Sequence, residues 1–175
     1  TTHPRGLGTV REVSRRGGNI VAINPLKERG LERFQDPQAA VEMMTNGSTP
    51  ISRYYFQPNV GGDYALMFGM LKHLREWDIQ ALAAGKKSVF DRSFIEMNTV
   101  GFDAMMEEID RTAWSDIHAH TGLSPEHLES LAKMYLDAKT AIFCWGMGIT
   151  QHRHGTANVH MLANLMLARG HIGRP

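Results

Sequence analysis

Two short stretches of the sequence carry residue types that could bind a phosphate or a nucleotide. In the first, Asn24-Pro25 ends the apolar run Asn19–Asn24, and the Asn24 amide stands where dinucleotide-binding folds usually hold an acidic residue for a ribose. In the second, Gly146-Met147-Gly148 and Gln151 follow another apolar run, and the missing glycine side chains leave room for a phosphate. Neither stretch completes the GxGxxG pattern, and glycine favours any strand-to-helix turn, so a turn without a ligand stays the alternative.

Histidines gather in two places, which raises the question of a metal site. His152, His154 and His160 follow the second stretch, and His118 and His120 form a His-x-His pair. Zinc sites usually combine such histidines with cysteine or carboxylate ligands at a fixed spacing, and the sequence places none beside them. We therefore predict no metal ligand. The sequence also offers no nucleophile–base pair and no carboxylate dyad, so we predict no catalytic residue.

The elements that would position the first stretch form half of a βαβ unit. Apolar residues recur every three positions within Pro4–Arg16, which predicts an amphipathic helix that ends at Gly17. The run Asn19–Asn24 is rich in β-branched residues and is ended by Pro25, as is typical of a buried parallel strand. A right-handed crossover begins at a parallel neighbour, so we expect the first strand of the unit upstream of Thr1.

The rest of the sequence predicts a long loop, a helical region and a second strand, turn and helix. Residues 26–61 hold scattered apolar residues among Pro, Gly and Asn, and we expect an irregular excursion over 36–60. The apolar run Ala141–Trp145 is too short for a helix and predicts a strand. Helical spacing and capping signals predict helices at Asp63–Trp77, Asp91–Met97, Phe102–Ile109, Ala113–Thr121, from Pro125 behind an N-cap at Ser124, and Thr156–Arg169. These elements indicate an α/β fold: a helix-rich, Rossmann-like three-layer α/β/α domain with parallel strands, truncated at its ends.

Size and composition limit the class of protein. The chain has 175 residues, of which 42% are hydrophobic, and we expect a single partial domain over 1–175. A net charge of +1 offers no cationic face for nucleic acid. The longest apolar stretch is about half of the roughly 20 residues that a membrane-spanning helix needs. A single cysteine, Cys144, leaves no partner for a disulfide within the chain. We therefore expect a cytoplasmic chain whose partners are neither nucleic acid nor membrane.

The sequence around both stretches resembles the molybdopterin oxidoreductases, with the nearest likeness to their formate dehydrogenase-like alpha subunits. The likeness rests above all on Cys144–His152, which reads CWGMGITQH, and also on Ile23–Phe34. Thr2–Arg5, Gly61–Leu66 and residues 163–175 agree in order and spacing. The WGMGxTQ string is specific to the family, whereas the shorter pieces add weight through their order. We therefore expect an internal fragment of a larger enzyme of this family.

The resemblance implies a bis-molybdopterin-guanine-dinucleotide (bis-MGD) cofactor with molybdenum or tungsten in the parent enzyme, and this chain would hold part of one MGD. The parent would carry out a two-electron oxidation of a small substrate such as formate, with the protein orienting and tuning the cofactor. Carried over by position, the cofactor-binding residues would be Asn24, Pro25, Leu26, Gly61, Gly62, Asp63, Met147 and Gln151.

Several parts of the family pattern are missing from these residues. The cysteine cluster that binds a [4Fe–4S] centre in many relatives is absent, and so is the Cys or selenocysteine that ligates the metal. Relatives often show an acidic or Cys-containing strand end where this chain has Ile23–Pro25, so we expect no carboxylate to bind guanosine there. The chain alone is expected to be inactive and to depend on the remaining domains of its parent.

Two other classes of protein fit the same residues. One is a free-standing nucleotide-binding α/β module without redox chemistry, and the other is a structural piece that needs a partner strand. An unpaired strand at the edge of the chain would also favour self-association, because its free N–H and C=O groups are a template for pairing.

Overall fold

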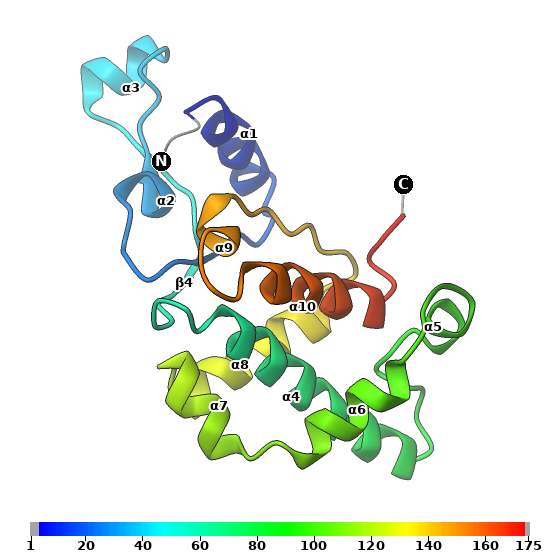
Figure 1. Cartoon of the computed structure of the whole chain (residues 1–175). Coiled ribbons are helices and arrows are strands. Elements are labelled where there is room, and N and C mark those ends of the chain that lie inside the picture. The colour runs from blue at the N-terminus through cyan, green and yellow to red at the C-terminus, as the bar shows by residue number, and fades with distance from the viewer. Residues whose placement is uncertain (1–3, 174–175) are drawn as a thin grey trace. The chain divides into compact units, whose positions relative to one another are not determined.

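The structure is a computed structural model that describes residues 4–173, and its contacts divide the chain into two compact units, 1–58 and 59–175 (Figure 1). Two pieces of the family resemblance, Thr2-His3 and Arg174-Pro175, lie outside the described residues. The sequence predicts that residues 1–175 are part of a single domain of a larger parent enzyme, and this stays a prediction.

The elements follow one another with helices in the majority. Unit 1 contains α1 (Pro4–Arg15), β1 (Val21–Ile23), α2 (Arg29–Glu32), β2 (Arg33–Phe34), α3 (Ala40–Thr45), β3 (Thr49–Pro50) and β4 (Tyr54–Phe56). Unit 2 contains α4 (Asp63–Ala83), α5 (Arg92–Asn98), α6 (Phe102–Arg111), α7 (Trp114–Thr121), α8 (Pro125–Asp137), α9 (Met147–Thr150) and α10 (Gly155–Ala168). The chain is therefore the helix-rich α/β protein that its sequence predicts.

A parallel pair of strands holds unit 1 together. Val21 pairs with Tyr54 and Ile23 with Phe56, so β1 and β4 run side by side in the same direction. One parallel neighbour of β1 thus comes from within residues 36–60, which the sequence predicts to be irregular. The aromatic residues of β4 favour a strand, but the strand is only three residues long and prolines flank it on both sides. The sequence pattern therefore does not predict it.

The excursion itself is ordered by charged side chains. The Arg11 guanidinium lies 2.8 Å from the Asp36 carboxylate, and the Arg15 guanidinium lies 3.0 Å from the Glu42 carboxylate. Glu42 also accepts a hydrogen bond from the Asp36 backbone N–H at 2.9 Å. These contacts fasten α3 to α1 with few apolar residues, and Val41 on α3 remains 73% exposed. Residues 36–60 therefore contain the short elements α3, β3 and β4 within the predicted excursion.

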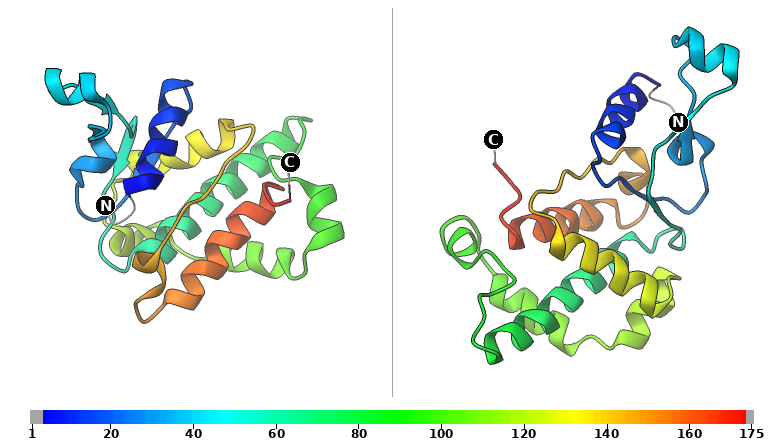
Figure 2. Two further views of the ribbon diagram at one scale, coloured as in Figure 1. Left: turned by 90° about the horizontal axis from the view of Figure 1, so that it is seen from above. Right: turned by 180° about the vertical axis from the view of Figure 1, so that it is seen from behind.

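The core of unit 2 is built around α4. This helix packs against α6, α7, α8 and α10, and the views of Figure 2 agree that α8 and α10 run alongside it. Leu71 and Leu74 of α4 are fully buried, as are Ile109, Leu128 and Leu165 of its neighbours. Ser124 caps α8 by accepting a hydrogen bond from the His127 N–H at 3.3 Å, as the sequence predicts.

The long helix α4 continues to Ala83, past its predicted end at Trp77. The prediction ends too early because the next residue, Asp78, is an acid that interrupts the apolar pattern. Asp78 is 0% exposed and accepts hydrogen bonds from the Ser88 hydroxyl at 2.5 Å and the Val89 N–H at 2.8 Å. Its second oxygen lies 2.6 Å from the Arg92 guanidinium. Ser88 and Val89 lie in the loop after α4, and Arg92 is the first residue of α5, so the buried acid fixes this loop and the start of α5 to α4.

Gly69 in the middle of α4 offers a stability test in which the usual rule is reversed. An added Cβ there would lie 2.6 Å from Leu128 and 2.8 Å from Ile117, both buried. Glycine to alanine normally stabilises a helix by about 1 kcal/mol, yet Gly69→Ala should destabilise this chain by about 1–3 kcal/mol through overpacking. Gly8 of α1 has open space, so Gly8→Ala is the control and should be neutral or stabilising. Urea unfolding of both variants gives the comparison, and equal effects would contradict it.

The strand predicted at Ala141–Trp145 does not form with any of residues 4–173. The segment has no regular structure, Ile142 is 91% exposed and Trp145 is 46% exposed. An extended segment becomes a strand only when a neighbour takes up its hydrogen bonds, and none of residues 4–173 does so.

No helix among the described residues is long and apolar enough to cross a membrane.

Candidate cofactor-binding site

The loop before α4 presents two glycines that differ in what they do. Gly61 has a φ of +84°, which favours glycine, and an added Cβ would meet nothing within 4 Å. Gly62 is buried, and a Cβ there would lie 2.7 Å from the His120 carbonyl oxygen. The chain's own packing explains Gly62, while Gly61 leaves open space at the start of α4. Asp63 begins the helix directly behind them.

The WGMGITQH stretch forms a tight turn with open backbone at its glycines. A Cβ at Gly146 or Gly148 would meet nothing within 4 Å, so the chain's packing does not require glycine at either position. The short helix α9 begins directly after Gly146 and makes a single turn that contains Gly148. At its end the Gln151 amide donates to the Met147 sulfur at 3.4 Å. Met147 is 68% exposed. The turn therefore offers bare backbone beside an exposed thioether and an amide, a surface that a ligand could approach closely.

His152 connects this turn to the start of α4. Its Nε2 lies 3.6 Å from an Asp63 carboxylate oxygen and 3.0 Å from the Asn158 side-chain nitrogen. Asn158 is 0% exposed and also donates to the Ile149 carbonyl at 3.1 Å. The pKa of Asp63 is raised above its ordinary value of 3.8 because burial is the largest influence on it. Its own backbone N–H and the nearby His152 act in the opposite direction but offset only part of this rise. These contacts bring the predicted residue Asp63 close to His152, which directly follows the predicted residue Gln151 in the sequence.

The buried Asn158 is left with one unpaired atom. Its side-chain oxygen has no hydrogen-bond partner among the described residues, although it is sealed from solvent. Buried polar atoms are normally paired, and an exception calls for an explanation such as a missing ligand or water. The unpaired atom lies in the same cluster as the turn, and it is consistent with a ligand-binding site.

The predicted residues of unit 1 form a second, separate turn. The Asn24 amide donates to the Glu28 carboxylate at 2.7 Å, and its oxygen accepts the Leu26 N–H at 3.3 Å. The Tyr55 hydroxyl of β4 donates to the Leu26 carbonyl at 2.6 Å, and Gln57, which follows β4, donates to the Pro25 carbonyl at 2.9 Å. Asn24 thus shapes the turn, and Leu26 is its exposed tip at 74%.

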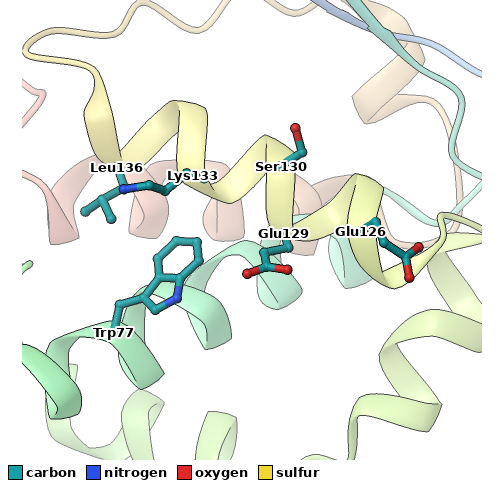
Figure 3. A pocket seen from close by; sticks show the side chains of 6 residues that line it. All are labelled: Trp77, Glu126, Glu129, Ser130, Lys133 and Leu136. Carbon is teal, nitrogen blue, oxygen red and sulfur yellow. The ribbon is translucent and has the colours of Figure 1, made fainter.

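Two open hollows on unit 2 lie away from these residues. One, of about 400 Å³, has the Trp77 indole of α4 below Glu126, Glu129 and Lys133 of α8 (Figure 3). The other, of about 410 Å³, includes Asp91 and His171. Neither contains a residue that the sequence predicts for cofactor binding, so size alone does not locate the candidate site.

Sequence reasoning missed the two residues that organise the site. The sequence places His152 in a histidine cluster without indicating its partners, and in residues 4–173 no three His, Cys, Asp or Glu side chains gather to hold a metal. Asn158 is not among the predicted residues. The available signal was a polar residue in the middle of an apolar helix, a position that burial makes costly unless the side chain has a defined role.

Gly155, the first residue of α10, gives a test of the turn. A Cβ at this position would clash with the Thr150 carbonyl oxygen, so the backbone of the turn must move. We expect Gly155→Ala to destabilise unit 2 by about 1–3 kcal/mol and to displace the turn, seen as amide shifts over residues 147–152 in NMR spectra. Gly148→Ala, with open space, is the control. Unchanged spectra for Gly155→Ala would contradict the packing.

The fold is similar to part of a solved enzyme structure. Acetylene hydratase from Pelobacter acetylenicus matches with a TM-score of 0.70 over 93% of this chain and 19% of its own, at 16% sequence identity. A family model for molybdopterin oxidoreductases matches residues 83–175, which include the turn, His152 and Asn158. The chain belongs to the molybdopterin oxidoreductase family, as its sequence indicated.

The relatives by sequence are much longer proteins. Protein YdeP of Escherichia coli K12 is 47% identical over all 175 residues, which span 23% of its length. An uncharacterized oxidoreductase of Mycobacterium tuberculosis is 35% identical over the same 175 residues, 22% of its length. The assimilatory nitrate reductase of Haloferax mediterranei is 39% identical over 113 residues, 65% of this chain and 14% of that protein. The chain therefore spans about a quarter of the length of the relatives that it matches throughout.

Proposed function

We propose that this chain is the part of a longer molybdenum- or tungsten-dependent oxidoreductase that holds one MGD of a bis-MGD cofactor. The observation that carries the proposal is the cluster of Asp63, His152 and Asn158, which joins the Gly61–Asp63 loop to the WGMGITQH turn. Both segments resemble cofactor-contacting segments of the family, and the approach of His152 to Asp63 supports a shared site.

The residues present fit a pterin nucleotide. Gly61, Gly146 and Gly148 expose backbone that the chain's own packing does not cover, as an approaching phosphate or ring requires. Met147 and Gln151 would contact the cofactor from the turn, and Asp63 from the start of α4. In unit 1, Leu26 and the turn shaped by Asn24 and Pro25 would contact the guanosine part. When bound, the cofactor supplies the two-electron chemistry, and these residues orient it.

The remaining domains of the parent would complete a Rossmann-like three-layer domain. The segment Ala141–Trp145 has the composition of a buried strand but no pairing partner among residues 4–173. A strand of the parent would pair with it, and in isolation this segment would favour self-association of the chain. Any [4Fe–4S] centre of the parent would be bound outside this chain.

Metal and pterin analysis of the longer natural protein tests the proposal. We expect molybdenum or tungsten with about two pterin guanine dinucleotides per chain. A pure, folded protein with neither metal nor pterin would overturn the proposal. It would favour a nucleotide-binding module without redox chemistry, which binding of GDP to the same protein would then support.

We propose formate as the substrate of the parent because of the resemblance to formate dehydrogenase-like subunits. The names of the similar proteins suggest other substrates that can be tested against it. Nitrate is the substrate named by relatives that match 65% and 91% of this chain, and acetylene hydration is the activity named for the structural neighbour. We expect formate-dependent dye reduction by the loaded protein. Nitrate-dependent dye oxidation without formate activity would move the parent into the nitrate reductase group.

A further inference from the structure

The orientation of the buried Asn158 amide is fixed by its backbone partner. One end of the amide lies 3.1 Å from the Ile149 carbonyl oxygen, which can only accept a hydrogen bond. This end is therefore the NH₂ group. The same nitrogen lies 3.0 Å from the His152 Nε2, so its second proton is directed at the imidazole.

This arrangement determines which nitrogen of His152 carries a proton. Because Asn158 donates, Nε2 must accept, and a neutral imidazole that accepts at Nε2 holds its proton on Nδ1. A proton on Nε2 would face the NH₂ group of Asn158 and lose that hydrogen bond. The Asp63 carboxylate, at 3.6 Å, is beyond hydrogen-bond distance from Nε2, and burial makes its charged form costly.

We propose that Asn158 holds His152 as the Nδ1–H tautomer, so that His152 is a further cofactor-binding residue that donates from Nδ1 to an oxygen of the bound nucleotide. The proposal rests on the proposed function for the identity of the ligand. The His152 side chain is 25% exposed and directly follows Gln151, so a group bound at the turn can reach it. An anionic oxygen is the acceptor that gains most from such a donor.

The tautomer can be measured on this chain without any cofactor. Two-bond ¹H–¹⁵N spectra recorded at alkaline pH, where free histidine is neutral, distinguish a protonated from an unprotonated ring nitrogen. The signal of His152 is assigned by its loss in His152→Asn. We expect a protonated Nδ1 and a bare Nε2, and a release of this preference in Asn158→Leu. A proton on Nε2 in the unmodified chain would overturn the proposal.

Two substitutions in the longer natural protein separate ligand binding from structural support. An asparagine amide nitrogen takes the place of Nδ1, whereas a glutamine amide takes the place of Nε2. His152→Asn should therefore keep the pterin but lose the contact with Asn158, which lowers the thermal midpoint. His152→Gln should keep the midpoint but release pterin roughly ten times faster, since it lacks the donor. Pterin is measured by fluorescence after oxidation.

The outcomes of this pair are distinct. Pterin loss that follows the fall in thermal midpoint in both variants would make His152 a structural residue only and overturn the proposal. An unmodified protein without pterin would instead overturn the proposed function, while the tautomer measured on this chain would still decide whether Asn158 sets the proton on His152.

Discussion

Asp78→Ala should lower the free energy of unfolding of unit 2 by about 2–4 kcal/mol, the largest effect of any single charge removal expected here. The substitution leaves the Val89 N–H and the Ser88 hydroxyl without their acceptor and opens a cavity at a site that is 0% exposed. Arg92 loses less, because its side chain is 43% exposed and can be hydrated. Urea unfolding followed by circular dichroism measures the difference.

Asp110 provides the matched control for this variant. Its carboxylate also binds an arginine, at 3.0 Å from Arg75, but the Asp110 side chain is 45% exposed. Exposed pairs of this kind contribute about 0–1 kcal/mol, so Asp110→Ala should be nearly neutral. If both variants lost similar amounts of unfolding free energy, the burial of Asp78 would not be the reason for its contribution to stability.

The Asp78 contribution also has a defined dependence on pH. Burial alone would raise the pKa of this carboxyl, but hydrogen bonds from Ser88 and Val89 and the Arg92 charge outweigh it and lower the pKa below its ordinary value of 3.8. A depressed pKa in the folded state stabilises the protein above the unfolded pKa, and the stabilisation is lost as pH falls through the folded value. The gap between the unmodified chain and Asp78→Ala should therefore narrow below about pH 4. A constant gap would contradict the ion pair.

Asn158→Asp should cost about 3 kcal/mol or more at neutral pH, since it places a carboxylate where no water reaches. The new oxygen would face the Ile149 carbonyl, which offers no proton, in place of the amide donor. The penalty should shrink at acid pH, where the new carboxyl is protonated and can donate again. Thermal unfolding at neutral and acid pH measures this change.

Asn164 on the same helix receives the same chemical change as a control. Its side chain is less buried than that of Asn158, so Asn164→Asp should cost less than about 1 kcal/mol. Equal losses at the two positions, or a loss at Asn158 that does not depend on pH, would show that the buried amide is not required as a donor.

The helices of unit 2 were predictable because their signals are local. The capping residue Ser124 and the apolar spacing that leads to Leu128 lie within a few positions of one another, and the structure begins α8 at Pro125 as expected. The end of α4 was missed because Asp78 is polar in sequence but buried in the fold, a distinction that depends on residues ten or more positions away.

The strands and the site depended on contacts that are not local. Tyr54 gives β4 its register with Val21, and no pattern within three residues can indicate that pairing. The Ala141–Trp145 run has the composition of a strand but no partner among the described residues. The resemblance proposes Gln151 and Asp63 as cofactor-binding residues, while the contact of His152 with Asp63 could not be predicted from spacing.

The parallel pairing of β1 with β4 has a consequence for how the chain tolerates change in length. The pair closes a loop over residues 24–53, whose ends are fixed by the register of Val21 with Tyr54. Loop-closure entropy grows only with the logarithm of length, so doubling such a loop costs about 0.6 kcal/mol. Since Val41 and Met44 within it are exposed, an extra segment can be accommodated beside them. A peptide inserted beside Val41 or Met44 should therefore destabilise the fold only slightly.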